Sequence, residues 1–356
     1  MKAATIRDVA ERARVSVASV SRVLTGAGAV TAPTRLRVME AVEALSYVPH
    51  SGARSLSTSR TDTVGVILPD LFGEFFSELI RGMDLAARAS GLHLIVSSSH
   101  DDASEAAAAI RSMRGRVDGL IVLSPHLDSV NLAASLTGRL PVLLMNGGAD
   151  DAGRPSIVVD NVGGAVTAVE HLLALGRRRI AHIGGPARNL EAHQREAGYV
   201  QAMRATGAEP RVVAGDFTQG SGHSAARALV AGPDRPDAIF AGNDMMAIGA
   251  LIALQEAGLR CPEDVALVGF DDVPISALVQ PALTTLRVDI VGTGRHAMER
   301  LVALIAASTA GAAPDGTCET LRPQLVIRQS TGGLQSPVVD PAPRVTPHIE
   351  SNGEPA

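Results

Sequence analysis

The chain lacks what several protein classes require. Cys261 and Cys318 are its only cysteines, which argues against a disulfide framework and against a zinc site built from cysteines. No apolar run is long enough to cross a membrane, and charged residues interrupt the N-terminal segment where a signal peptide would be apolar. We therefore expect a cytoplasmic protein with no membrane partner.

The motifs of common enzyme classes are also absent. No G-x-G-x-x-G follows the first predicted strand, and the chain has no P-loop, no H-E-x-x-H and no G-x-S-x-G. The ten histidines do not form the close pairs that are typical of metal ligands. We expect no enzymatic activity, no cofactor and no metal ion.

Charge is unevenly distributed along a chain of otherwise ordinary composition. The 356 residues are 46% apolar and 19% charged, which leaves room for two or three domains with large cores. Residues 1–60 carry nine Lys and Arg against four Asp and Glu, a net charge of +5, whereas the whole chain is −5. A basic head on an acidic body suits DNA, because phosphates attract the head and repel the body.

The first two dozen residues predict two short helices joined by a tight turn. Thr5 can cap the first helix, and Ser16 can cap a second that runs to about Leu24. Helical spacing turns one set of side chains inward, namely Ile6, Val9, Ala10, Ala13, Val20, Val23 and Leu24. It turns another set outward, namely Val17, Ala18, Ser21 and Arg22. This outward face fits a DNA major groove; an ordinary helical hairpin is the alternative.

A third helix is predicted from about 31 to 46 and completes a head of residues 1–46. We expect its buried face to comprise Leu36, Val38, Met39, Val42 and Leu45. Residues 47–60 are mostly polar, with Leu56 as the large apolar side chain near their end. They form either a linker or a segment that orders on DNA with Leu56 inserted into the minor groove.

Residues 61–330 alternate between apolar strands and helices. The predicted strands are 64–68, 92–97, 119–123, 141–145, 157–159, 180–183, 238–240 and 265–270, and the helices are 74–90, 103–114, 163–175, 193–206 and 247–257. This order predicts an α/β fold with two sets of parallel strands, which form two lobes with a cleft between them. Residues 331–356 are rich in Pro, Gly and Ser, and we expect a disordered tail.

The head resembles the DNA-binding head of the lactose-repressor (LacI/GalR) family in the pattern T-x-x-D-V-A-x-x-A-x-V-S-x-x-S-V-S-R-V-L from Thr5 to Leu24. Tyr47-Val-Pro and Ala53-Arg-Ser-Leu56 resemble the hinge helix of that family. Four motifs then follow in family order, namely Val159-Asp-Asn, Arg195-x-Ala-Gly-Tyr199, Gly242-Asn-Asp-x-Met-Ala-x-Gly249 and Val268-Gly-Phe-Asp-Asp272. The resemblance covers about residues 4–330.

The resemblance implies a regulator, most simply a repressor, that binds double-stranded operator DNA. It implies a homodimer, with a tetramer left open, and a periplasmic-binding-protein-like core that holds a small molecule between two lobes. Ligand-dependent closure of the lobes would then change how the heads and hinges sit. Whether the ligand releases DNA or favours DNA binding stays open.

The DNA contacts are predicted residue by residue. Arg22 fits the O6 and N7 atoms of guanine, although a phosphate contact is the alternative. Val17 and Ala18 occupy positions where family members read bases, whereas Thr5, Ser16 and Ser21 suit phosphates. The resemblance places three further contacts in the hinge, at His50, Ala53 and Leu56. His50 stands where the family usually has Asn.

The effector contacts are expected where strands end, since open α/β sheets bind ligands beyond the carboxyl ends of their strands. The candidates are Phe72, Asn146, Asp160, Arg195, Phe217, Asn243 and Asp271. By resemblance Arg195, Asn243 and Asp271 are the foremost, and Arg195 can meet both Asp271 and a ligand hydroxyl. Asp244 is a further candidate that is as well explained as a helix cap, and Asp160 as a brace for a turn.

These side chains favour a carbohydrate. Carboxylates, amides and an arginine each make paired hydrogen bonds to neighbouring hydroxyls. A flat purine would call for more ring stacking than a chain with 2% aromatic residues offers. The alternative function is a solute-binding protein of the periplasmic sugar-binding type, but such a protein needs export and has no use for residues 1–60.

Overall fold

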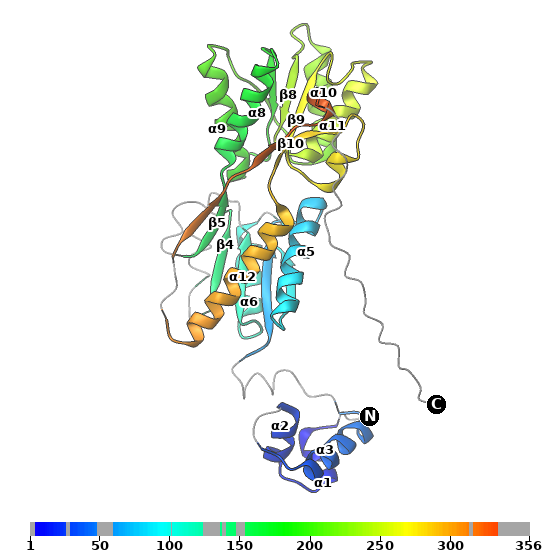
Figure 1. Ribbon diagram of the computed structural model, residues 1–356, viewed down its shortest axis with the longest axis vertical. Coiled ribbons are helices and arrows are strands. Elements are labelled where there is room, and N and C mark those ends of the chain that lie inside the picture. The colour runs from blue at the N-terminus through cyan, green and yellow to red at the C-terminus, as the bar shows by residue number, and fades with distance from the viewer. Residues whose placement is uncertain are drawn as a thin grey trace, which may run out of the picture. The chain divides into compact units, whose positions relative to one another are not determined.

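The computed structural model describes residues 4–25, 29–47, 60–100, 102–123, 136, 140–146, 154–312 and 316–333. Two compact units are formed: unit 1 from residues 1–158 and 290–320, and unit 2 from residues 159–289 and 321–356 (Figure 1). The three-helix head at the start of unit 1 has a core of its own. The predicted hinge contacts His50, Ala53 and Leu56 lie outside the described residues.

The head consists of α1 (Ile6–Ala13), α2 (Val17–Thr25) and α3 (Ala32–Ala44). Thr5 caps α1 in a reciprocal capping box with Asp8, and Ser16 Oγ accepts a hydrogen bond from the Ser19 N–H at the start of α2. The head core contains Val9, Ala10, Ala13, Val20, Val23, Val38, Ala41 and Tyr47. The predicted first two helices and their inward faces are confirmed.

The predicted buried face of the third helix is partly wrong. Leu36 and Met39 are half or more exposed, while the buried face is formed by Val38 and Ala41 with Val42 and Leu45 packed beside them. At about 100° per residue these four positions share one side of the helix, and Leu36 points away from it. Tyr47 is buried in the head core, so the packed head extends at least one residue beyond 46.

Unit 1 contains a six-stranded sheet in the order β11-β5-β4-β3-β1-β2. The strands are β1 (Thr63–Leu68), β2 (His93–Ser98), β3 (Gly119–Leu123), β4 (Val142–Met145), β5 (Ser156–Val159) and β11 (Cys318–Leu321). Its helices are α5 (Glu74–Ala89), α6 (Ala103–Met113) and α12 (Ile290–Thr309). One face of the sheet packs on α6, and Gly119 on the other face lies against Leu301 and Ile305 of α12.

Helices α5 and α12 pack against each other at two glycines. A Cβ atom on Gly82 would lie 2.1 Å from the Val291 carbonyl oxygen, and one on Gly294 would lie 2.2 Å from that of Leu79. No L side chain fits at such distances, so glycine at both positions allows the two backbones to approach closely. This contact joins segments about 200 residues apart in the chain.

Unit 2 contains a second six-stranded sheet in the order β12-β10-β9-β8-β6-β7. The strands are β6 (Ile180–Ile183), β7 (Arg211–Val213), β8 (Ala238–Ala241), β9 (Ala266–Asp271), β10 (Thr284–Arg287) and the antiparallel β12 (Gln324–Val326). Helices α8 (Asn161–Ala174) and α9 (Leu190–Ala205) cover one face, and α10 (Gln219–Ala231) and α11 (Asp244–Glu256) cover the other. The predicted α/β fold with parallel sheets is thereby confirmed.

The end of the ordered core differs from the prediction. Short 3₁₀ helices span Pro274–Ala277 and Gln329–Thr331. Thr331 is buried, and its hydroxyl lies 2.9 Å from His171 Nε2 and 2.8 Å from the Thr284 hydroxyl. Residues 331–333 therefore belong to unit 2 and not to the predicted tail; residues 334–356 lie outside the described residues.

Candidate functional site

The head presents the outward face that the sequence predicted. Val17, Ala18 and Arg22 are exposed on α2, and Ser21 is half-buried. Arg22 makes no ion pair with any other described residue, so its guanidinium is available for an outside partner. Thr5 and Ser16 are exposed while they cap their helices, and an exposed hydroxyl at a helix start suits a phosphate contact.

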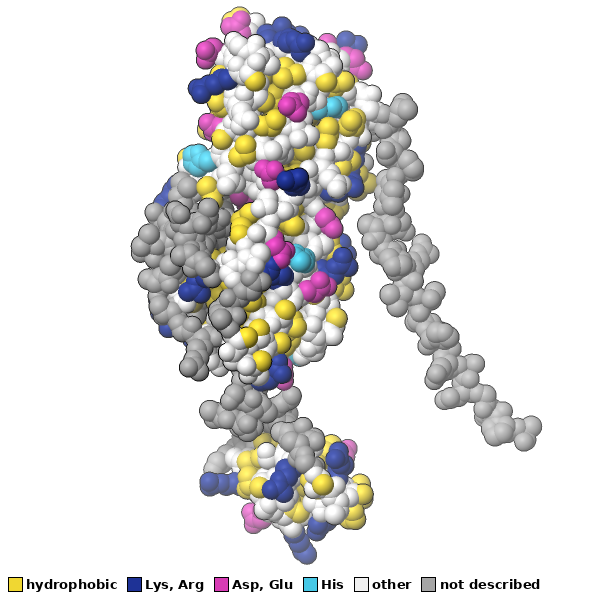
Figure 2. Space-filling model, turned by 60° about the vertical axis from the view of Figure 1, so that its left-hand side comes forward, with side chains coloured by type: hydrophobic (Ala, Val, Ile, Leu, Met, Phe, Trp, Pro, Cys, Tyr) yellow, Lys and Arg dark blue, Asp and Glu magenta, His cyan; other side chains and the backbone are white. Residues whose placement is uncertain are grey.

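The head surface is rich in arginine (Figure 2). All six arginines among its described residues are exposed, namely Arg7, Arg12, Arg14, Arg22, Arg35 and Arg37. The carboxylate of Asp8 accepts hydrogen bonds from the Thr5 N–H and hydroxyl at the start of α1. The positive excess noted in the sequence is thus displayed on the folded head.

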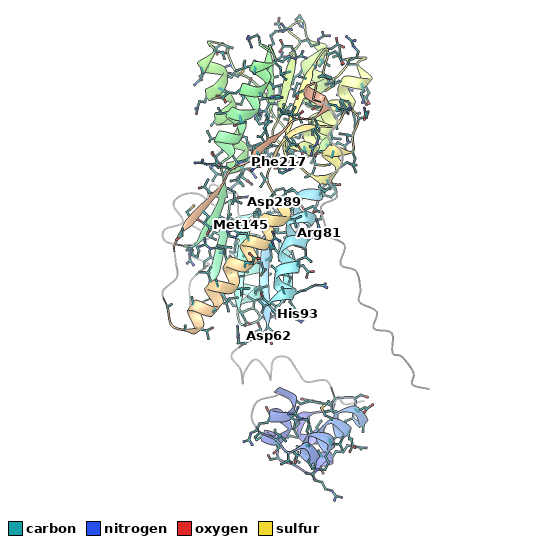
Figure 3. All side chains as sticks on the ribbon, viewed as in Figure 1. Asp62, Arg81, His93, Met145, Phe217 and Asp289 are labelled. Carbon is teal, nitrogen blue, oxygen red and sulfur yellow. The ribbon has the colours of Figure 1, made fainter. Side chains whose placement is uncertain are left out.

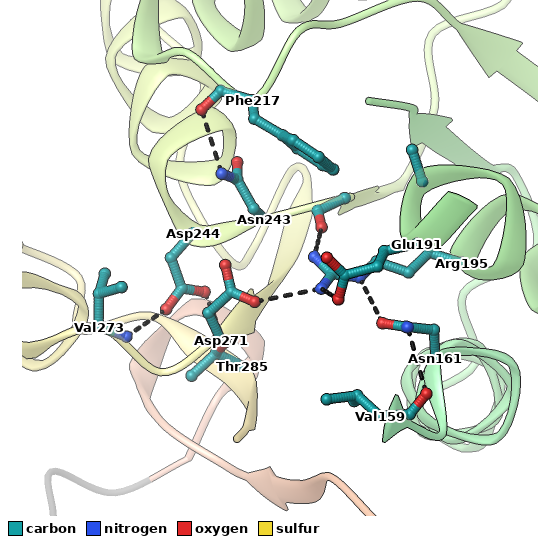
Figure 4. A network of polar contacts seen from close by, with 12 residues as sticks. Val159, Asn161, Glu191, Arg195, Phe217, Asn243, Asp244, Asp271, Val273 and Thr285 are labelled. Atoms are coloured by element: carbon teal, nitrogen blue, oxygen red, sulfur yellow. Dashed lines mark hydrogen bonds and ion pairs between the residues drawn. The ribbon is translucent and has the colours of Figure 1, made fainter. Parts of the chain in front are cut away.

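In unit 2 a buried arginine organises a cluster of polar groups at the carboxyl ends of β8 and β9 (Figure 4). Arg195 Nε donates to Asn161 Oδ1 over 2.9 Å, and Arg195 Nη1 donates to the Gly242 carbonyl over 2.5 Å. Arg195 Nη2 lies 3.4 Å from Asp271 Oδ1 and 3.7 Å from Glu191 Oε1. The guanidinium also stacks 3.8 Å from the centre of the Phe270 ring. We call these groups the Arg195 cluster.

Two further predicted residues lie at this cluster. The Asn243 side chain caps α11 by accepting from the Met246 N–H, and its Nδ2 donates to the Phe217 carbonyl over 3.1 Å. The Phe217 ring is half-buried, with its centre 5.7 Å from Arg195 Cζ (Figures 3 and 4). The structure therefore brings Arg195, Phe217, Asn243 and Asp271 together, as the resemblance implied.

Asp271 is the electrostatically unusual member of the cluster. Burial raises the pKa of its carboxyl to about 7, since the opposing effect of nearby Arg195 is smaller, and the negative charge of Glu191 raises the pKa further. At 3.4 Å, the contact of Arg195 Nη2 with Asp271 Oδ1 is longer than a strong charge-assisted hydrogen bond. Asp271 Oδ1 is buried with no hydrogen-bond partner among the described residues, so it can accept a hydrogen bond from a ligand.

The loop that carries Asp271 is held in an uncommon backbone conformation. Asp271 and Asp272 both have positive φ angles, of 106° and 60°. The Asp272 carboxylate accepts from Arg287 Nε over 2.5 Å and lies 2.7 Å from Arg328 Nη2. These contacts stabilise a turn that would otherwise be strained and so fix the position of the Asp271 carboxylate.

The helix-cap interpretation of Asp244 is wrong. Asn243 is the capping residue of α11, whereas Asp244 is fully buried. The Asp244 carboxylate accepts from the Thr285 hydroxyl over 2.5 Å and from the Val273 N–H over 2.9 Å. Burial, and secondarily the charge of Asp271, raise its pKa well above the usual range. Through these two hydrogen bonds Asp244 holds the backbone that follows Asp271 in place against β10.

The Val159-Asp-Asn motif contributes to the cluster a residue that was not among the candidates. Asp160 caps α8 by accepting from the Gly163 N–H, which matches the alternative of a residue that braces a turn. Asn161 is the member that reaches the cluster, where it binds both Arg195 and Gln194. Glu191 was also missed. Its position four residues before Arg195 was the available signal, but the predicted helix began at His193 and left Glu191 outside it, whereas α9 begins at Leu190.

The two remaining candidates belong to unit 1. Phe72 follows β1 and is 76% exposed, in a turn where Asp70 accepts from two backbone N–H groups. Asn146 follows β4, directly after the labelled Met145 (Figure 3), and is buried with a positive φ of 55°. Phe72 and Asn146 therefore belong to a different unit from the Arg195 cluster, which lies wholly in unit 2.

Among the residues that the structure describes, no group of three or more His, Cys, Asp or Glu side chains is placed to hold a metal ion. In the same residues no helix combines the length and the apolar character that a membrane span requires.

Comparison with known proteins decides the family. Residues 5–50 match the sequence profile of bacterial regulatory proteins of the lacI family, and residues 169–331 match that of a periplasmic binding protein-like domain. The HTH-type transcriptional repressor CytR of Escherichia coli strain K12 is 34% identical over 336 residues, which cover 93% of this chain and 97% of CytR. The chain belongs to the lacI family.

Solved structures of lacI-family proteins agree with this assignment. The lac repressor dimer bound to operator and the anti-inducer ONPF aligns with a TM-score of 0.82 at 31% identity, covering 93% of this chain and 99% of that one. The complex of the regulator CelR with cellobiose aligns with a TM-score of 0.66 at 31% identity, covering 92% and 99%. This lacI-family protein is a DNA-binding transcriptional regulator controlled by a small molecule and not an enzyme, as predicted.

Proposed function

We propose that the protein is a repressor whose head reads an operator and whose Arg195 cluster binds a carbohydrate. The observation that carries the effector assignment is the buried Asp271 oxygen, which has no hydrogen-bond partner among the described residues and stands beside a guanidinium. A sugar hydroxyl supplies the missing donor, and its oxygen accepts from a neighbouring N–H. The cellobiose complex of the relative CelR supports this ligand class.

In the head, Arg22 contacts a guanine, and Val17 and Ala18 lie against base edges in the major groove. Thr5, Ser16 and Ser21 hold phosphates, and His50, Ala53 and Leu56 form the hinge contacts in the minor groove. In the core, Arg195, Phe217, Asn243 and Asp271 bind the effector directly. Phe72, Asn146 and Asp160 keep their predicted role as further effector contacts.

The protein acts in the cytoplasm as a homodimer, because one head reads one half of a near-palindromic operator. The dimeric operator complex of the lac repressor, its structural relative, supports this assembly. Light scattering of the purified protein distinguishes a dimer from a tetramer and from a monomer.

The decisive experiment measures operator binding, with the upstream region of the protein's own gene as the probe, against a panel of sugars, sugar phosphates and purines. We expect one sugar to change operator affinity at least tenfold, a coupling of about 1.4 kcal/mol. The direction of the change separates an inducer from a corepressor. Loss of specific binding to every promoter fragment, with or without these compounds, would contradict the proposal.

The variant Asp271→Asn isolates the effector site from the head. It replaces the carboxylate oxygens with a weaker acceptor and a donor, so the response to the sugar should be lost while operator affinity without ligand is retained. If Asp271→Asn responds to the sugar like the wild type, the Arg195 cluster is not the effector site.

A further inference from the structure

Glu191 is a second carboxylate of the Arg195 cluster, beside Asp271. It is the second residue of α9, which Asn189 caps by accepting from the Ala192 N–H. An acidic residue in a first turn usually stabilises the helix end from the solvent side. Here the side chain is only 14% exposed and its carboxylate faces Arg195 Nη2 over 3.7 Å (Figure 4).

The charge of the Arg195 cluster is negative when its carboxyl groups are ionised. One guanidinium lies between the carboxylates of Glu191 and Asp271, and the buried Asp244 lies behind Asp271. Glu191 and Asp271 are close enough that the charge of Glu191 disfavours the ionised form of Asp271. The raised pKa values of Asp271 and Asp244 favour their protonated forms, so the negative charge that faces Arg195 comes from Glu191 and from the ionised fraction of Asp271. An anion that entered the cluster would meet this negative charge at short range in a largely buried site.

The hydrogen-bonding groups of the cluster also disfavour an anionic ligand. Two nitrogens of Arg195 already donate to Asn161 and to the Gly242 carbonyl, and the third faces the two carboxylates. An anionic ligand would have to displace a carboxylate to reach the guanidinium. In contrast, Asp271 Oδ1 faces Arg195 at 3.4 Å but has no hydrogen-bond partner among the described residues, and such an acceptor suits a hydroxyl or an ammonium group.

We propose that Glu191 determines the charge class of the effector. Together with Asp271 it makes the site accept uncharged or positively charged polyhydroxylated compounds, such as neutral sugars and amino sugars, and exclude sugar phosphates and uronic acids. This inference rests on the proposed effector site at the Arg195 cluster and specifies its ligand more narrowly.

The test uses sets of sugars that differ only in charge, added to the full-length protein. Suitable sets are glucose, glucosamine, glucuronic acid and glucose 6-phosphate, and the corresponding galactose compounds. Calorimetry measures the affinity of each compound, and operator release gives a second readout. In the set that binds, we expect the acidic and phosphorylated members to bind at least about tenfold more weakly than the neutral parent.

The variant Glu191→Gln keeps the shape of the side chain and removes its charge. We expect Glu191→Gln to reduce about tenfold the ratio of the affinity for the neutral sugar to the affinity for its anionic counterpart. We also expect it to lower the affinity for the amino sugar relative to that for the neutral sugar. Glu196→Gln is the matched control, because it changes the net charge equally on the same helix without a described ion pair to Arg195. Unchanged operator affinity without ligand shows that both variants are folded.

The outcomes separate the two proposals. If an anionic member binds the wild type as tightly as its neutral parent, or if Glu191→Gln leaves the ratio unchanged, the role of Glu191 is wrong while the effector site stands. If no compound of any charge binds, the carbohydrate assignment itself is wrong and the inference falls with it.

Discussion

His182 shows how a single side chain can couple this core to pH. It is fully buried on β6, with its ring stacked on those of Tyr199 and Phe240 at 5.1 and 4.8 Å. Its Nδ1 lies 2.9 Å from the Phe240 carbonyl, and its Nε2 has no hydrogen-bond partner among the described residues. Burial lowers the pKa of the imidazole to about 4. Between pH 6.5 and about 4 the folded protein therefore keeps the His182 imidazole neutral, whereas the same histidine is protonated in the unfolded chain.

The consequence is a loss of stability in mild acid. Because the folded pKa lies below the usual 6.5, this contribution is complete above pH 6.5 and is lost as the pH falls towards 4. Between pH 7.5 and pH 5 the free energy of unfolding of the wild type should fall by about 2 kcal/mol more than that of His182→Phe. Denaturant unfolding followed by circular dichroism measures this difference, since the chain has no tryptophan. Parallel pH profiles of the two proteins would rule the effect out.

Motifs, and residue types that follow strands, allowed much of the proposed effector site to be predicted. Arg195, Asn243 and Asp271 stand in motifs, and parallel strands bring their carboxyl ends to one edge, so the sequence order was enough to group them. Asn161 and Glu191 were missed because their roles depend on side-chain direction. A motif shows that Asp160 and Asn161 are present, but only the start of α8 decides which becomes the cap and which reaches Arg195.

The contact between α5 and α12 requires glycine at the two positions where the helix backbones meet. Gly82→Ala would put a methyl group 2.1 Å from the Val291 carbonyl oxygen, where backbone and not a flexible side chain must move. We expect this substitution to destabilise the protein by about 2–4 kcal/mol in denaturant unfolding. Gly220→Ala is the control, because its Cβ would meet nothing closer than Thr218 Oγ1 at 3.9 Å. A helical alanine with open space should be neutral or slightly stabilising.

Most elements could be predicted from apolar patterns, with bounds accurate to a few residues. The bounds of the strands 119–123 and 180–183 were predicted correctly because each is a short, mostly apolar run that helices cover on both faces, with His182 as the polar exception. Helices α10 and α12 were not predicted. Small residues dilute the apolar stripe of α10, and in α12 Gly294, which permits close packing, and Gly292 weaken the helical signal. In α3 the apolar Leu36 and Met39 misled the assignment of the face because Ala41, a small residue with a weak apolar signal, is part of the buried face.

For the whole molecule, the separation of charge predicts a strongly salt-dependent interaction with DNA. If each head of a dimer neutralises about four phosphates, the logarithm of operator affinity should fall with the logarithm of salt concentration with a slope of roughly −7. Fluorescence anisotropy of a labelled operator between low and moderate salt measures this slope. A slope near zero would contradict a DNA contact made by the arginines of the head.

The same assay distinguishes base reading from phosphate binding at Arg22. Arg22→Ala should weaken operator binding by about 1–3 kcal/mol and relax specificity at one base pair of each half-site. Arg22→Lys retains the charge but loses the two-pronged geometry. If Arg22→Lys binds the operator with the affinity and specificity of the wild type, Arg22 contacts a phosphate. If both its affinity and its specificity are below those of the wild type, Arg22 reads a base.

The path of the chain through its two units has a consequence for synthesis. Unit 2 is inserted into unit 1, because α12 and β11 return to unit 1 only after residue 289. Unit 2 in turn depends on Ser330, whose hydroxyl donates to the Leu267 carbonyl and accepts from the Thr284 N–H. A nascent chain on the ribosome therefore holds two incomplete sheets until its final segments emerge. A premature stop codon before residue 290 would leave both unit 1 and unit 2 incomplete.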